Sequence, residues 1–207
     1  MEKRAGRPRA QDAPASAEQI LGVAFRAFAT YGYDGVSVRT LNRQLGVSHN
    51  LIHQRFGSKC ELWYAAVDHA FGAQIVAIAT TFDPTLSDPL DQLRHAIAHF
   101  LGYCAEHPEL LGLMNIESRV ESERLDYIYD TYVAPALAPL GRLLEHLAQG
   151  GRIRPIGLGA LHFLIAHGAA APFTLTALAR RFDAEPPDPA GHAQLLAEVI
   201  VAGLEIR

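Results

Sequence analysis

Residues 46–59 read GVSHNLIHQRFGSK, a stretch in which hydrogen-bonding side chains outnumber apolar ones. At about 100° per residue, a helix over this stretch gathers four polar side chains within an arc of roughly 140°. These four are His49, Asn50, His53 and Gln54. Leu51 and Ile52 point to the opposite side, where they would anchor the helix to a core. The stretch therefore predicts a short helix with one hydrogen-bonding face and one buried face.

The residues before this helix complete a predicted helix-turn-helix. Ser37 is an expected N-cap, and apolar residues then repeat on one side of a short helix that Gly46 ends. Ser48 is the expected N-cap of the next helix, which should finish near Phe56 after about two turns. Two short helices joined by a turn that contains glycine are typical of a helix-turn-helix.

The hydrogen-bonding face of the second helix suits the major groove of DNA. Asn, Gln, His and Arg side chains read the donor and acceptor patterns of base edges there. Ser48, Arg55 and Lys59, at the edges of the helix, would contact phosphates. The alternative is a solvated helix face, but such faces are usually rich in Glu and Lys, and no acid stands between Asp34 and Glu61.

The charge of the chain is unevenly distributed. Residues 1–60 hold nine Lys and Arg against four Asp and Glu, a net charge of +5, which leaves −9 for the remainder of a chain whose total is −4. A basic segment joined to an acidic body is typical of a polyanion-binding module with a regulatory domain. The two cysteines, Cys60 and Cys104, form no CxxC motif, so reduced thiols in a cytosolic protein are expected.

Hydrophobic periodicity along the 207 residues predicts an all-α protein with about nine helices in total. Residues 1–15 form an expected flexible basic arm without a signal peptide, 16–60 the helix-turn-helix domain, and 61–207 an effector-binding and dimerisation domain. The expected helices after the helix-turn-helix cover 59–83, 88–106, 108–117, 122–149, 157–181 and 190–205. Pro135 and Pro139 should kink or split the helix over 122–149.

The segment 155–179 contains no Asp, Glu, Lys or Arg and is long enough to span a bilayer. It nevertheless carries His162, His167 and Pro172 and has no interfacial Trp. A buried helix or a subunit interface requires the same apolar composition. We therefore expect no membrane span.

The span from Ile20 to Trp63 resembles the DNA-binding domain of TetR-family transcriptional regulators. The resemblance rests on the AFxxFAxxGYxxxSV pattern that begins at Ala24, the GVS turn, the FGSK end of the second helix and a long helix after it. It implies a three-helix DNA-binding domain, a double-stranded DNA operator, a small-molecule effector, a homodimer, no cofactor and no enzymatic activity. It also implies a cytoplasmic, nucleoid-associated protein.

Carried over by position, the resemblance implies a role for eight side chains. The expected base readers are Arg39, His49 and Asn50. The expected phosphate contacts are Ser37, Ser48, His53, Gln54 and Lys59.

The chain departs from the family pattern at two positions. His53 stands where the family usually has tyrosine, which would make that phosphate contact sensitive to pH, since imidazole titrates near neutrality. Asn42 stands where a small residue, usually alanine, is found, so the packing of the two short helices should differ. In the arm, Arg7 and Arg9 would either enter a minor groove or belong to a solubilising tail.

The acidic body should hold the dimer interface and the effector site. Helices over 157–181 and 190–205 are expected to form a four-helix interface across a two-fold axis. An apolar or aromatic effector would lie among a set of large side chains, although such residues are ordinary core residues as well. The set comprises Phe71, Ile75, Phe100, Met114, Tyr127, Tyr132, Phe163 and His167.

Other functions are disfavoured by the absence of their motifs. His95 and His99 have the spacing of a metal pair, but a solvated helix face explains them, so no metal site is expected. A helical enzyme has no GxSxG, HExxH, phosphate-loop or Cys-centred motif to support it, and no catalytic residue is assigned. A binding protein whose DNA-binding domain is vestigial, or whose effector is another protein, remains an alternative.

Overall fold

The computed structural model describes residues 15–79, 83, 85–182 and 188–206, with only the backbone described over 73–79. Among these residues all regular structure is helical, which confirms the predicted fold class. The chain divides into two compact units, Met1–His69 and Ala70–Arg207. The boundary of 60 that the sequence suggests lies close to this division and stays a prediction.

The first unit contains α1 (Ala17–Gly35), α2 (Val38–Gln44), α3 (Leu51–Phe56) and the start of α4 (Lys59–Ala79). Ser16 caps α1, because its hydroxyl accepts from Gln19 N–H at 3.1 Å while the Gln19 side chain accepts from Ser16 N–H at 2.8 Å. Gly32 interrupts the helical geometry of α1 with φ 70°. The core contains Ile20, Phe25, Phe28, Ile52, Leu62 and Trp63.

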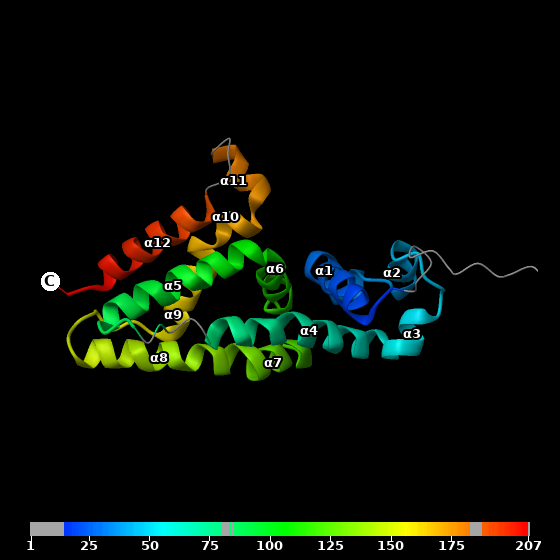
Figure 1. Cartoon of the computed structure of the whole chain (residues 1–207), viewed down its shortest axis with the longest axis horizontal. Helices are drawn as coiled ribbons and strands as arrows, with labels where there is room; N and C mark the ends of the chain where they lie inside the picture. The colour runs from blue at the N-terminus through cyan, green and yellow to red at the C-terminus, as the bar shows by residue number, and fades with distance from the viewer. Residues whose placement is uncertain (1–14, 80–82, 84, 183–187, 207) are drawn as a thin grey trace, which may run out of the picture. The chain divides into compact units, whose positions relative to one another are not determined.

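The second unit is built around α5 (Pro89–Glu106), along which α12 (Pro189–Leu204) lies (Figure 1). The other segments are α6 (Pro108–Glu117), α7 (Glu123–Ile128), the π-helical η2 (Tyr129–Val133), α8 (Ala134–Gln149), α9 (Leu158–Phe163), the π-helical η3 (Leu164–Ala169), α10 (Ala171–Thr174) and α11 (Thr176–Phe182). Leu93 and Leu101 of α5 are fully buried in the same cluster as Ala197 and Val201 of α12. Their burial joins the two helices into one core.

Proline explains both interruptions of the long helices expected from the sequence. The expected helix over 122–149 is split by η2 just before Pro135, which confirms the predicted break. The prediction of a continuous helix over 157–181 is wrong, since η3, a turn at Ala170 and a break at Leu175 divide it. Because Pro172 has no N–H, it cannot donate to the carbonyl four residues earlier, and the backbone before it is reorganised.

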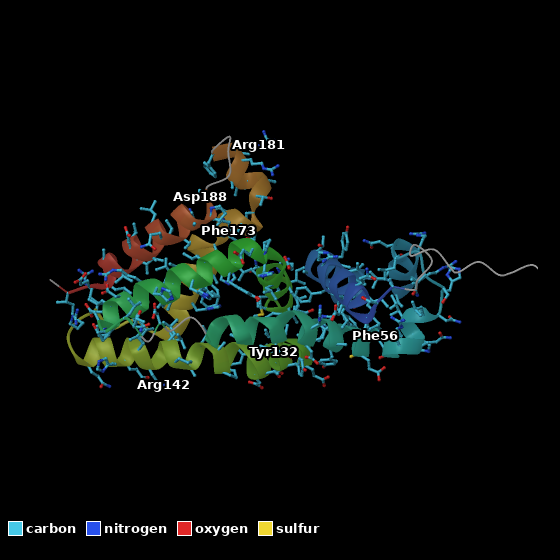
Figure 2. The ribbon with its side chains drawn as sticks, in the orientation of Figure 1. Phe56, Tyr132, Arg142, Phe173, Arg181 and Asp188 are labelled. Carbon is cyan, nitrogen blue, oxygen red and sulfur yellow. The ribbon has the colours of Figure 1, made fainter. Side chains whose placement is uncertain are left out.

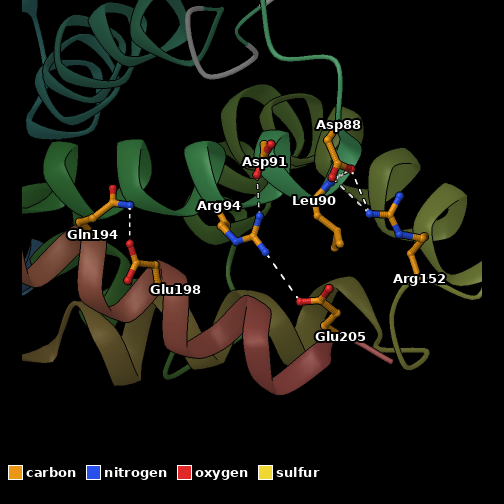
Figure 3. Close-up of polar contacts among 8 residues, drawn as sticks. All are labelled: Asp88, Leu90, Asp91, Arg94, Arg152, Gln194, Glu198 and Glu205. Atoms are coloured by element: carbon orange, nitrogen blue, oxygen red, sulfur yellow. Dashed lines mark hydrogen bonds and ion pairs between the residues drawn. The ribbon is translucent and has the colours of Figure 1, made fainter. Parts of the chain in front are cut away.

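Polar contacts fix the ends of the second unit (Figure 3). Asp88 caps α5 by accepting from Leu90 N–H at 3.1 Å, and Arg152 lies 3.2 Å from the same carboxylate. The Leu90 N–H bond and the guanidinium of Arg152 lower the pKa of Asp88. The guanidinium of Arg94 lies 2.6 Å from the Asp91 carboxylate and 3.7 Å from the Glu205 carboxylate. An ion-pair network therefore links α5 to the end of α12. No helix of the described residues is long and apolar enough to cross a membrane.

Candidate DNA-binding surface and ligand cavity

The turn between α2 and α3 is held by the buried side chain of Asn42. This side chain, only 1 % exposed, donates from Nδ2 to the His49 carbonyl at 2.9 Å. Its Oδ1 accepts from Ile52 N–H at 3.4 Å, one of the backbone donors that the first turn of α3 leaves without an intrahelical acceptor. Asn42 therefore acts as a cap that the neighbouring helix supplies to α3.

The second short helix begins later than the sequence indicates. The prediction of Ser48 as its N-cap is wrong, because α3 starts at Leu51 with Asn50 at the capping position and no side-chain cap bond. His49 and Asn50 consequently lie in the turn before the helix rather than on its face. Asn42 takes the place of the expected serine cap, because its side chain accepts from Ile52 N–H at the start of α3.

The eight side chains that the sequence assigns to DNA are all at least partly accessible to solvent. Seven are exposed, and Lys59 is half-buried with Nζ 4.5 Å from the centre of the Tyr33 ring. Arg55, expected at the phosphate-facing edge, instead donates to the Ala15 carbonyl at 2.6 Å. The exposed seven are Ser37, Arg39, Ser48, His49, Asn50, His53 and Gln54.

His53 is held by a hydrogen bond at the end of α3. Its Nδ1 lies 2.8 Å from the carbonyl oxygen of Gly57, an acceptor, so Nδ1 must carry the proton. Nε2 of the neutral ring is then a hydrogen-bond acceptor, and it becomes a donor only when the imidazole is protonated. The phosphate contact expected at His53 stays a prediction.

The junction between α3 and α4 combines a glycine at positive φ with a capping box. Gly57 has φ 76° and ψ −124°, a conformation that residues with a Cβ rarely adopt. Ser58 N–H donates to Glu61 Oε2 at 2.7 Å, and Glu61 N–H donates to Ser58 Oγ at 3.2 Å. The bonds to Ser58 lower the pKa of Glu61, so the capping box is present at neutral pH and is lost as the pH falls through that lowered pKa.

The second unit encloses a cavity of about 350 Å³, a size suited to a small organic ligand. Six of the side chains expected at an effector site line it, and Phe163 and His167 are largely exposed at its edge. The six are Phe71, Phe100, Met114, Tyr132, Phe163 and His167. Tyr127 is not among the lining residues, although its ring centre lies 6.2 Å from that of Tyr132. The side chain of Ile75 is outside the described residues.

Several cavity residues were missed because they are polar. The expectation that His95 and His99 share a solvated face is wrong for His99, which lines the cavity and whose pKa is lowered by burial and by His95. His162 stands five residues before His167. This spacing would place the two side chains on different faces of an α-helix, so the sequence did not indicate that both line one cavity. Within the described residues no group of three or more His, Cys, Asp or Glu is placed to hold a metal ion.

We predict that acidification destabilises the second unit through His162. Burial and the neighbouring His167 lower the pKa of His162, so the unfolded chain binds this proton more tightly than the folded one. The free energy of unfolding should be constant above about pH 6.5, the ordinary histidine pKa, and should decrease as the pH falls from there towards the lowered pKa. His99 contributes in the same direction.

Thermal unfolding followed by circular dichroism between about pH 7.5 and about pH 5 measures this effect. His162→Phe should flatten the decline, whereas the matched change at an exposed histidine of α8, His146→Phe, should retain it. Equal slopes for wild type and His162→Phe would contradict the prediction.

A helix-turn-helix that exposes a polar surface from a stretch without Asp or Glu, joined to a helical unit with a largely apolar cavity, is typical of a DNA-binding regulator of transcription. Residues 20–66 match the family described as "Bacterial regulatory proteins, tetR family", and residues 89–201 match the "Tetracyclin repressor-like, C-terminal domain". The second match alone covers more than half of the chain. The protein therefore belongs to the TetR family of transcriptional regulators, and it is not an enzyme.

Individual relatives agree with this assignment. The HTH-type transcriptional repressor NicS of Pseudomonas putida is 27 % identical over 110 residues, which cover 53 % of this chain and 51 % of NicS, about half of that relative's length. The TetR-family regulator PfmR of Thermus thermophilus has a TM-score of 0.64 at 21 % identity, covering 93 % of this chain and 100 % of PfmR. FadR of Bacillus subtilis, solved with stearoyl-CoA, has a TM-score of 0.65 at 18 % identity, covering 92 % and 100 %. The last two share the fold with this chain.

Proposed function

We propose that this protein is a repressor that binds a palindromic operator as a homodimer and leaves it when a small apolar or aromatic molecule occupies the cavity. The observation that carries the proposal is the exposed polar surface of residues 37–59, a stretch without Asp or Glu, within a unit that matches the DNA-binding domain of the family. A repressor among its relatives supports the direction of control.

The proposed contacts divide between bases and phosphates. Arg39, His49 and Asn50 are proposed to read base edges in the major groove. The remaining side chains would fix the register on the duplex through phosphates. These are Ser37, Ser48, His53, Gln54 and Lys59.

Exposed apolar side chains support a dimer through segments 157–181 and 190–205. Leu175 and Leu178 are each 53 % exposed on α10–α11, and Leu195 and Val199 are 56 % and 59 % exposed on α12. A helical face of this kind gains stability when a second copy covers it. By contrast, α8 presents the exposed charge of Arg142 to solvent (Figure 2). A two-fold dimer would place its recognition helices about 34 to 36 Å apart, one turn of DNA.

Release from DNA requires the effector to favour one arrangement of the dimer over another. The helix α4 carries both Lys59 of the first unit and Phe71 of the cavity wall, so we propose that it transmits the change. To shift the dimer from 1 % to 99 % in the arrangement that releases DNA, the effector must bind that arrangement about 5.5 kcal/mol more tightly than the other. The protein would act in the cytoplasm, on nucleoid DNA.

Selection of bound fragments from sheared genomic DNA by the purified protein tests this proposal, and we expect a palindromic site to be enriched. Asn50→Ala should cost about 1–3 kcal/mol of affinity and relax the preference at one base position. Lys59→Ala should weaken binding to all sequences and reduce the salt slope by about 1. Removing an exposed cation of the second unit, Arg142→Ala, should leave both properties unchanged. Failure to enrich any palindrome, with both first-unit variants indistinguishable from wild type, would overturn the proposal.

A further inference from the structure

The polar end of the cavity is created by a π-helical turn. His162 and His167 both line the cavity, and their ring centres lie 6.4 Å apart. In an α-helix, positions five residues apart diverge by roughly 140°, so the two imidazoles would face different surroundings. In η3 the backbone is instead π-helical, and Ala170 N–H donates to the Ile165 carbonyl, five residues earlier, at 2.9 Å. The wider turn brings both imidazoles to one wall.

Neighbouring residues hold this π-helical turn in place. Pro172 follows it and lacks the N–H that an uninterrupted α-helix would need. His192 of α12 donates from Nε2 to the Ala169 carbonyl at 2.8 Å and thereby satisfies an acceptor at the end of η3. The ring of Phe173 packs against His192 with 5.3 Å between centres. The π-helical turn is thus fixed by Pro172 and by contacts from His192 and Phe173, not by His162 or His167.

The cavity wall combines apolar with polar side chains. None of its described lining residues is Asp, Glu, Lys or Arg. Burial lowers the pKa of His162 and His99, and burial raises the pKa of the Cys104 thiol to about 12. Burial also raises the pKa of Tyr103. At neutral pH these groups are therefore uncharged and offer a bound ion no counter-charge.

An ionic ligand would lose its hydration in this cavity without compensation, which is costly. Phosphate groups, such as those of the stearoyl-CoA in the FadR structure, are recognised best by Arg and Lys, and these are absent from the described wall. A neutral imidazole has one N–H and one lone pair, so two of them side by side can serve a hydroxyl as both acceptor and donor. No hydrogen bond to another described residue engages the ring nitrogens of His162 or His167.

We propose that the cavity binds an uncharged aromatic molecule that carries a hydroxyl group, and that His162 and His167 bind this hydroxyl between them. The ring centre of Phe100 lies 6.5 Å from that of His162, and the ring centre of Phe163 lies 5.3 Å from that of His167. The aromatic part of the ligand would therefore contact apolar rings next to the two histidines. This inference rests on the proposed function, since it defines the ligand of the same cavity.

Three naphthalene probes of one ring size test the inference by isothermal titration calorimetry with the full chain at neutral pH. The probes are naphthalene, 2-naphthol and the 2-naphthoate anion. Wild type should bind 2-naphthol about ten-fold more tightly than naphthalene, because of the hydroxyl, and more tightly still than 2-naphthoate. His162→Phe should remove the preference for 2-naphthol over naphthalene, measured as the ratio of the two dissociation constants in the same variant. His162→Gln, which keeps a donor and an acceptor, should restore much of it.

His146→Phe, at an exposed histidine outside the cavity wall, is the matched control and should bind all three probes as wild type does. Tighter binding of 2-naphthoate than of 2-naphthol, or an unchanged preference in His162→Phe, would overturn the inference, as would binding of none of the probes. These titrations contain no DNA, so a negative result would contradict only the proposed ligand class. The proposed repressor is contradicted instead by a DNA selection that yields no operator.

Discussion

Asn42→Asp should destabilise the first unit by about 3–5 kcal/mol at neutral pH, the cost of an uncompensated buried charge. The substitution preserves the size of the side chain and changes only its hydrogen-bonding groups. Oδ1 of Asn42 accepts from Ile52 N–H, which a carboxylate would also do. The Nδ2 position, however, lies 2.9 Å from the His49 carbonyl, where a carboxylate oxygen would meet another acceptor without a proton between them. With 1 % exposure, the site gives water no access to relieve the repulsion.

The pH dependence of this variant has a definite sign. Burial raises the pKa of an introduced carboxyl group above its value in the unfolded chain. The protonated form can donate to the His49 carbonyl, so the loss of stability should be small at acid pH and should grow as the pH rises through the raised pKa. Operator affinity should follow the same trend, because the bonds of Asn42 fix the turn that carries His49 and Asn50.

Urea unfolding followed by the fluorescence of Trp63, the single tryptophan of the chain, reports on the first unit directly, since this side chain is fully buried there. Gln44→Glu adds the same charge at an exposed position of α2 and should change the free energy of unfolding by less than about 0.5 kcal/mol. Asn42→Ala, the residue usual in the family, should cost about 1–3 kcal/mol at any pH. If Asn42→Asp and Gln44→Glu unfold alike, the capping role of Asn42 is wrong.

Hydrophobic period and turn residues were sufficient to predict the all-helical fold and the helix-turn-helix. They were sufficient because each short helix has one apolar face and ends at a glycine with positive φ, Gly46 or Gly57. The predicted start of α3 is too early because the prediction places its N-cap at Ser48, whereas the side chain of Asn42 from α2 caps it. A cap supplied by another helix leaves no pattern in the local sequence. Asn42 could still be identified as unusual from the family pattern.

The apolar wall of the cavity was largely predictable, whereas its polar residues were not. Phe71, Phe100 and Tyr132 are large side chains on helices, and such residues line either a core or a cavity. His162 was missed because the prediction assumed α-helical angles, and the π-helical turn of η3 depends on Pro172 and on His192 of a distant helix. Angular arguments along one helix fail where the tertiary structure changes the number of residues per turn.

Gly57→Ala should destabilise the first unit by about 2–4 kcal/mol, through backbone strain and the loss of a helix cap together. The pair φ 76° and ψ −124° lies outside the regions open to alanine. An added Cβ would also overlap Glu61 Oε2 and lie 3.0 Å from its Cδ. Glu61 could move away only by releasing Ser58 N–H, to which it is bonded at 2.7 Å, and this would break the capping box of α4.

Gly46→Ala separates the two contributions. Gly46 has φ 65°, but a Cβ added there meets no atom within 4 Å, so only the backbone cost of about 1–2 kcal/mol applies. Trp63 fluorescence during urea unfolding should therefore rank wild type, Gly46→Ala and Gly57→Ala in decreasing stability. Glu61→Gln in the Gly57→Ala background should recover little, because the same Cβ would displace the amide. Equal losses for the two glycine variants would show that Glu61 moves freely, and the junction before Lys59 would then depend on the conformation of Gly57 alone.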